Sequence, residues 1–131
     1  MKNAKLMTIF FMANMNTSFA QNNVANNGVR TRSVTRFQNV VTQTINVGGT
    51  DFYYRKLGEN NSGVPIIFLN HLSATMNECD PRIMDGLASS HQIICFDNRG
   101  IGATKGTTPQ TVSEMATDAI AFIKSTGLQT S

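Results

Sequence analysis

The 131-residue sequence predicts an α/β fold in which an antiparallel hairpin precedes parallel strands with crossover helices. Two strand-like stretches flank the dipeptide Gly48-Gly49, which is a turn signal. Two short, continuous apolar runs come next, as expected for strands that are covered on both faces. A segment with helical signals follows each run, and this alternation is typical of parallel strands.

The hairpin strands are expected at residues 41–47 and 51–57. In the first strand, Val41, Ile45 and Val47 support the two-residue period of a half-buried strand. The second strand, DFYYRKL, is rich in aromatic residues, which favour strands. The parallel strands are then expected in VPIIFLN, whose proline lies near the strand start where a missing amide costs least, and in QIICFD.

Two helices are expected after these runs. The first covers residues 81–89, with Asp80 as its N-cap. The second opens at Thr108-Pro109 and ends at Gly127, a glycine of the kind that terminates helices. Apolar residues at helical spacing predict the buried face of each helix. These residues are Ile83, Met84 and Leu87 in the first helix, and Val112, Met115, Ala116, Ala119, Ile120 and Ile123 in the second.

The N-terminal residues 1–20 are predicted to be a secretory signal peptide. A positive n-region (MKNAK) and an apolar h-region (LMTIFFMANM) precede small residues that suit cleavage after Ala20. The apolar region is too short for a typical membrane-spanning helix, so the expected location is periplasmic or secreted. A buried N-terminal helix is the alternative interpretation. The polar residues 21–39 are expected to be disordered, and residues 40–131 to form the folded domain.

The positive charge of the chain is concentrated near its N-terminus. The formal net charge is +3, but five of the eleven basic residues precede Val40 and all eight acidic residues follow it. The folded part is therefore slightly acidic. Because nucleic-acid binding needs a basic face on the folded domain, no nucleic-acid partner is expected.

The two cysteines, Cys79 and Cys95, leave two alternatives open. Export permits a disulfide between them. Cys95, however, lies in an apolar strand where a free thiol packs well, so two free thiols are favoured. Their spacing matches no metal motif, and neither a metal site nor a cofactor is expected.

The glycines of DNRGIGATKGTT suggest a phosphate-binding loop, but their order does not fit one. Lys105 precedes Gly106, whereas a P-loop needs glycine, then lysine, then serine or threonine. The loop is better explained by its conformation. Gly100 and Gly102 permit positive φ angles, Asp97 is expected to bond nearby amides, and Arg99 is expected to tie the loop to a carboxylate or to carbonyls.

Two segments carry a family resemblance. NHLSA, at residues 70–74, and DNRGIGAT, at residues 97–104, each follow an apolar strand. Together with the elements around them, from residue 44 to residue 127, they resemble the N-terminal part of the α/β-hydrolase fold, closest to its esterase and non-haem haloperoxidase-like branch. DNRGIGAT matches the family loop D-x-R-G-x-G-x-S, with Thr104 in the last place. NHLSA matches the family's H-G-x segment, with Leu72 where glycine is usual.

The resemblance implies that residues 40–131 form the N-terminal portion of a partial α/β-hydrolase sheet. The backbone amides of Leu72 and Ser73 would then supply one half of an oxyanion hole. Losing one such donor typically costs about 3 kcal/mol of transition-state stabilisation. The residues that the resemblance marks as structural are His71, Asp97, Arg99, Gly100 and Gly102.

The catalytic residues of such an enzyme are not in this sequence. Acyl transfer by this fold needs a serine in G-x-S-x-G, then an acid, then a histidine, and the 131 residues contain no G-x-S-x-G. His91 precedes a strand, at the sheet edge opposite the two loops. The chain is therefore expected to be an N-terminal fragment of an exported, esterase-like serine hydrolase, truncated before the nucleophile and inactive alone. Its parent would act on a small ester-like substrate.

A secreted, non-enzymatic binding module that reuses half the fold is the alternative function. A parallel sheet that lacks its next strand leaves an unpaired apolar edge, which favours self-association. No membrane partner is expected beyond the export signal.

Overall fold

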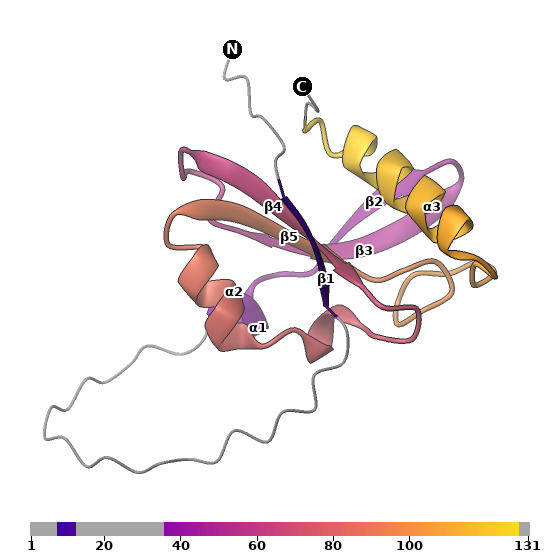
Figure 1. Cartoon of the computed structure of the whole chain (residues 1–131), viewed down its shortest axis with the longest axis horizontal. Helices are drawn as coiled ribbons and strands as arrows, with labels where there is room; N and C mark the ends of the chain where they lie inside the picture. Colours follow the sequence, from indigo (N-terminus) through magenta and orange to yellow (C-terminus); the bar gives the residue numbers. More distant parts are fainter. Residues whose placement is uncertain (1–7, 13–35, 129–131) are drawn as a thin grey trace, which may run out of the picture.

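The computed structural model describes residues 8–12 and 36–128 (Figure 1). In this part of the chain, five strands form one sheet in the order β1-β4-β5-β3-β2. No helix among the described residues is both long and apolar enough to cross a bilayer. In chain order the elements are β1 (Thr8–Met12), α1 (Arg36–Asn39), β2 (Gln43–Val47), β3 (Thr50–Leu57), β4 (Gly63–Asn70), the 3₁₀ helix η1 (Met76–Glu78), α2 (Pro81–Leu87), β5 (His91–Phe96) and α3 (Val112–Ser125).

The predicted hairpin is confirmed. Strands β2 and β3 pair in antiparallel register. Gly48 and Gly49 between them have φ angles of 57° and 88°. Positive φ at both central residues defines the two-residue turn that matches the twist of paired strands, and glycine adopts it without strain. The first strand starts later than expected, because Val41 lies outside β2 and is exposed.

The parallel strands are also confirmed. β4 and β5 are neighbours in parallel register, with Ile66 opposite Ile93 and Phe68 opposite Cys95. β3 pairs in antiparallel register with the other edge of β5, which joins the hairpin to the parallel strands. This mixed sheet with helices on both faces is the predicted fold class.

Each face of the sheet packs on its own helices (Figure 1). The first core, on the face of α1 and α2, contains Ile66, Phe68, Ile93 and Cys95 of the central strands. The second, on the face of α3, contains Ile67, Ile94 and Phe96. Neighbouring residues of β4 and β5 therefore alternate between the two cores. This alternation explains why both strands are continuously apolar in sequence.

Helix α2 has the predicted N-terminus but a partly wrong buried face. The Asp80 carboxylate accepts a hydrogen bond from the Arg82 amide, as an N-cap does. The helix ends at Leu87, two residues earlier than expected. Met84 is buried, but the Ile83 side chain is 46% exposed. With fewer than two full turns in contact with the sheet, the helix presents a narrower apolar face than the spacing suggested.

Helix α3 begins at Val112 rather than at Thr108-Pro109. Thr111 is its N-cap, and Thr111 and Glu114 form a reciprocal capping box. The predicted apolar stripe is wrong at three of its members, because Val112 is 80% exposed, Ile120 is 53% exposed and Ala116 is also exposed. The residues of α3 that are buried are Ala119, Phe122 and Ile123.

Phe122, which the predicted stripe omitted, is the centre of the α3 interface. Its ring stacks on Phe96 of β5 at a centroid distance of 4.3 Å. It also contacts Phe52 and Tyr54 of β3, at 6.0 and 5.6 Å. This large aromatic group fixes the rotation of α3 about its axis on the sheet. The smaller side chains of Ala119 and Ile123 are then buried on the same face of the helix.

Two short elements lie in the N-terminal segments predicted to be a signal peptide and a disordered linker. β1, inside the predicted signal peptide, pairs in parallel with β4. α1 includes Phe37, which is buried, and Asp85 of α2 accepts hydrogen bonds from the amides of Arg36 and Phe37, each at 2.8 Å. The folded part therefore begins before residue 40. Residues 1–7 and 13–35, which include the predicted cleavage site after Ala20, lie outside the described part, and signal cleavage stays a prediction.

Candidate functional site

The polar interior of the described chain is concentrated at one edge of the sheet. Four polar residues are buried among the residues that the structure describes, namely Asn70, Asp97, Asn98 and Thr104. They lie at the carboxyl ends of β4 and β5 or in the loops that follow these strands. In open α/β sheets this edge is where ligands bind. We therefore take these two loops as the candidate site.

Two asparagines clamp the loop that follows β4. The Asn98 amide group donates to the carbonyl oxygens of Asn70 and His71, at 3.1 and 3.3 Å. The Asn70 amide group donates to the Phe96 carbonyl oxygen at 3.1 Å. Because each bond joins the end of one parallel strand to the end of the other, the point where the chain leaves β4 is fixed relative to β5.

Asp97 connects the two loops more directly. Its Oδ1 atom accepts a hydrogen bond from the Met76 amide at 2.8 Å, and its Oδ2 atom accepts one from the Ala103 amide at 3.2 Å. Its own amide donates to the Tyr53 carbonyl oxygen of β3. The predicted contact with nearby amides is thus confirmed. The structure adds that one of these amides belongs to the other loop.

Gly102 is required by this arrangement. Its φ angle is 56°, and a Cβ atom on it would lie 2.3 Å from Asp97 Oδ2. Gly100, with φ 74°, is crowded in the same way by Gly106 and Thr108. Neither position would accept a side chain without displacing its neighbours, which explains the two glycines of DNRGIGAT.

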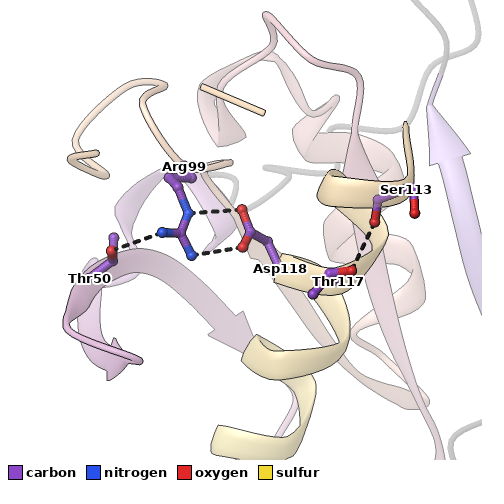
Figure 2. A network of polar contacts seen from close by, with 5 residues as sticks. All are labelled: Thr50, Arg99, Ser113, Thr117 and Asp118. Atoms are coloured by element: carbon purple, nitrogen blue, oxygen red, sulfur yellow. Dashed lines mark hydrogen bonds and ion pairs between the residues drawn. The ribbon is translucent and has the colours of Figure 1, made fainter. Parts of the chain in front are cut away.

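Arg99 ties the loop after β5 to helix α3 (Figure 2). Its guanidinium forms a bidentate ion pair with the Asp118 carboxylate, with N···O distances of 2.9 and 2.7 Å. A third nitrogen lies 3.4 Å from Thr50 Oγ1, and the group is 5.8 Å from the Phe52 ring centroid. The expected tie to a carboxylate is confirmed. Asp118 itself was not predicted as the partner.

The loop after β4 begins with a tight turn that presents two free backbone donors. The Ala74 amide donates to the His71 carbonyl oxygen at 3.0 Å, which makes Leu72 and Ser73 the central residues of the turn. Within the part of the chain that the structure describes, the amides of these two residues donate no hydrogen bond. Leu72 is 40% exposed and Ser73 is exposed. Two adjacent free amides at this edge are suited to bind an anionic oxygen.

His71 and Ser73 form a contact that does not amount to a catalytic pair. Ser73 Oγ lies 3.3 Å from His71 Nδ1. An activated serine also needs its histidine to be oriented by a third group, usually a carboxylate. Among the described residues, no carboxylate forms a hydrogen bond or an ion pair with His71. His91 is no substitute, since it starts β5 at the opposite edge and its Nδ1 atom contacts the Val64 carbonyl oxygen.

The glycine loop does not provide a phosphate site. Its centre holds the Asp97 carboxylate, which already accepts the Ala103 amide from within the loop. A negative group at this position repels phosphate rather than binding it. The described residues also contain no group of three histidine, cysteine or acidic side chains that could hold a metal ion.

No family model and no curated protein matches the chain. A solved α/β-hydrolase fold protein from Chitinophaga pinensis matches 67% of this chain at 43% identity, with a TM-score of 0.63. The chain carries part of an α/β-hydrolase fold. This α/β-hydrolase segment covers only 32% of the Chitinophaga pinensis chain.

Two more distant structures show the same fold. The enol-lactonase from Burkholderia xenovorans LB400 is 21% identical, with a TM-score of 0.57, and 33% of it is covered by 65% of this chain. An epoxide hydrolase from Vigna radiata is 22% identical, with a TM-score of 0.53, and 30% of it is covered by 70% of this chain. The chain thus spans about a third of the length of the hydrolase-fold proteins that it matches.

Several residues that shape the site were missed by sequence reasoning. Asn70 and Asn98 each stand at or just beyond the end of an apolar strand, and this position was the available signal. Asp118 gave no such signal, because it is one acidic residue on the surface of an amphipathic helix. Its pairing with Arg99 depends on how α3 packs on the sheet.

Proposed function

We propose that this chain provides the N-terminal part of an exported, esterase-like serine hydrolase, in which the amides of Leu72 and Ser73 form one half of the oxyanion hole. The parent protein would cleave a small ester-like substrate, with water or peroxide as the acceptor. The observation that carries the proposal is the turn after β4, whose two central amides donate no hydrogen bond to any residue that the structure describes. The turn is held in place by Asn98 and is followed by Met76, which is bonded to Asp97.

Rigid placement is what makes these amides useful for catalysis. A donor stabilises a developing oxyanion only if it needs no rearrangement during the reaction. Buried hydrogen bonds from Asn98 fix the carbonyl groups of Asn70 and His71, immediately before the turn. Leu72 and Ser73, the central residues of the turn, are exposed in the part of the chain that the structure describes.

The same proposal makes the 131-residue chain inactive by itself. It contains two histidines, His71 and His91, and no G-x-S-x-G. Incubation of the purified chain with p-nitrophenyl acetate should give no turnover above buffer, and a fluorophosphonate probe should label no serine. Labelling of Ser73 would contradict the proposal, because it would show that His71 activates this serine.

The hydrolase assignment is tested by the coding sequence beyond codon 131. A frame that encodes G-x-S-x-G within a few dozen codons supports it. Absence of such a motif from all three frames counts against it. Export is tested separately by N-terminal sequencing of the protein recovered from the cell envelope and from the medium, where the proposal expects a chain that begins at Gln21.

The role of the amides is best measured in a chimera. The part of this chain that matches the Chitinophaga pinensis protein would replace the corresponding part of that protein, and fluorophosphonate labelling would be followed. Leu72→Pro removes one amide at the turn position where proline fits best. Labelling should slow by a factor on the order of 100, as for loss of one oxyanion donor. The control is Ser73→Ala, which keeps its amide and should change the rate little.

The alternative is a secreted, non-enzymatic binding module. β1 pairs with β4 and covers the β4 edge of the sheet only in the uncleaved chain, because signal cleavage after Ala20 would remove β1. A chain that is monomeric and melts in one cooperative transition would support a self-sufficient module. Aggregation or gradual melting would favour a segment that needs the rest of a hydrolase.

A further inference from the structure

The two cysteines of this chain lie in contact, although 16 positions separate them. Cys79 is the C-cap of η1, in the loop after β4, and Cys95 is the next-to-last residue of β5. Their Sγ atoms are 3.0 Å apart, and both residues are buried. A disulfide bond is about 2.05 Å long, so the two sulfur atoms need to approach by only about 1 Å.

The surroundings of the Cys95 thiol favour its neutral form over the thiolate. The side-chain Oδ1 atom of Asn70 lies 3.5 Å from the Cys79 sulfur, and the side-chain Nδ2 atom of Asn70 lies 3.5 Å from the Cys95 sulfur. Otherwise the site belongs to the first core, with Phe68 and Met84 nearby in the same cluster. The hydrogen bond with Cys79, followed by burial, raises the pKa of the Cys95 thiol well above its usual range. A stable thiolate for metal binding or nucleophilic chemistry is therefore disfavoured.

We propose that Cys79 and Cys95 form an intramolecular disulfide when the chain folds in the presence of a small-molecule disulfide. The Cys79 thiolate attacks one sulfur of the oxidant, and one thiolate of the oxidant leaves. The Cys95 thiolate then attacks the Cys79 sulfur of this mixed disulfide, and the second thiolate leaves. The two cysteines are oxidised by two electrons, the oxidant is reduced to two thiols, and the protons of Cys79 and Cys95 pass to these thiols.

Cys79 is the better first nucleophile of the two. It lies in a loop and retains slight exposure, whereas Cys95 is in a central strand and has none. Exchange is expected while the loop is still mobile during folding, because a small-molecule disulfide cannot reach the closed core. Once formed, the bond would join the far end of the loop after β4 to β5. This inference does not depend on the proposed function, although the same loop carries the amides of Leu72 and Ser73.

The test is to refold the full 131-residue chain in buffers of stepped oxidised-to-reduced glutathione ratio. Free thiols are then alkylated under denaturing conditions, and intact mass distinguishes a closed disulfide from two alkylated cysteines. We expect an intramolecular disulfide with a single midpoint. Retention of two alkylatable thiols at every ratio, or disulfides only between chains, would overturn the proposal.

A second measurement distinguishes a disulfide favoured by the folded structure from one formed by chance collision of the two thiols in an unfolded chain. The same equilibrium is measured in concentrated urea, where the chain is unfolded. If the folded structure holds the sulfurs in place, the disulfide should be favoured over the unfolded chain by a factor on the order of 100, the value for closing a loop of this length. An equal or smaller equilibrium constant in the folded chain would show that the fold opposes the bond.

Cys79→Ala is the matched control for the effect on stability. Alanine fills part of the same apolar site and cannot form the bond. The urea midpoint of the wild-type chain should rise under oxidising conditions, whereas that of the variant should not respond to the glutathione ratio. A wild-type midpoint that is equally insensitive would contradict the proposal. The folded-to-unfolded comparison on the wild-type chain remains decisive if the variant does not fold.

Discussion

Replacing Gly102 with alanine tests whether Asp97 holds together the loops after β4 and β5. The new Cβ atom would lie 2.3 Å from Asp97 Oδ2, far inside the normal contact distance. The carboxylate must therefore move by about 1 Å or more. Oδ2 is also the atom that accepts the hydrogen bond from the Ala103 amide, so this bond should break.

Gly48 provides a control that is matched in backbone conformation. Its φ angle is 57°, against 56° at Gly102, and a Cβ atom on it would meet nothing within 4 Å. The left-handed conformation costs about 1 kcal/mol for alanine at either position. Only Gly102→Ala also loses a hydrogen bond to a charged acceptor, which contributes about 1.5–3 kcal/mol. We expect losses of about 1 kcal/mol for Gly48→Ala and about 3 kcal/mol for Gly102→Ala.

The assay is equilibrium unfolding in urea, followed by far-ultraviolet circular dichroism. With a denaturant slope of about 1–3 kcal/mol per molar for a protein of this size, the two variants should differ in midpoint by roughly 1 M. The change in unfolded-chain entropy on replacing glycine is common to both variants and cancels. Equal losses in the two variants would refute the reasoning, because the carboxylate would then have moved without cost.

Three further predictions concern the helices and the sheet edge. Phe122→Ala should lower the free energy of unfolding by about 3–5 kcal/mol, because it removes a buried ring. Ile120→Ala, on the exposed face of α3, should lower it by less than about 0.5 kcal/mol. Similar losses in the two variants would mean that Phe122 is not the residue that α3 packs against the sheet. The hydrogen bond from Arg82 lowers the pKa of Asp80 below 3.8, so their pair stabilises the fold above that pH and its contribution is lost as the pH falls through the folded-state value. Because the pair is solvent-exposed, we expect its contribution to be small. The difference in melting temperature between wild type and Asp80→Asn should shrink on acidification, and a constant difference would exclude the ion pair as its source. A chain of residues 21–131, which lacks β1, should self-associate more than the full chain in sedimentation velocity, because the edge of β4 is then unpaired. Equal self-association of the two chains would argue that the β4 edge does not promote association.

The elements that the sequence predicted well are those specified by local chemistry. The turn at Gly48-Gly49 was predictable because few residues other than glycine adopt positive φ at two successive positions. The strands β4 and β5 were predictable because a short, fully apolar run is typical of a strand covered on both faces. The partial α/β-hydrolase sheet followed from these elements and from the DNRGIGAT motif.

Helix α3 shows where local periodicity was insufficient. A stripe through Val112 and Ile120 fits the helical period, but both side chains are exposed. The signal that would have corrected the helix start was present, since Thr111 and Glu114 have the spacing of a capping box. The rotation of the helix was decided by Phe122, which packs against the aromatic rings of Phe96 and Phe52. These two rings belong to two different strands, β5 and β3. The choice between the two apolar stripes therefore depended on how α3 packs on the sheet, which the helix sequence alone does not specify.

The sequence by itself determined the turn, the two buried strands and the glycines that the loop after β5 requires, because each depends on backbone preferences within a few residues. Only the tertiary structure decided which polar groups meet at the sheet edge. Asn98 reaches the carbonyl of Asn70, and Cys79 lies against Cys95, because β4 and β5 run in parallel side by side and end together. Hydrogen bonds and sulfur contacts act over a few ångströms, and parallel pairing brings into that range residues that are far apart along the chain.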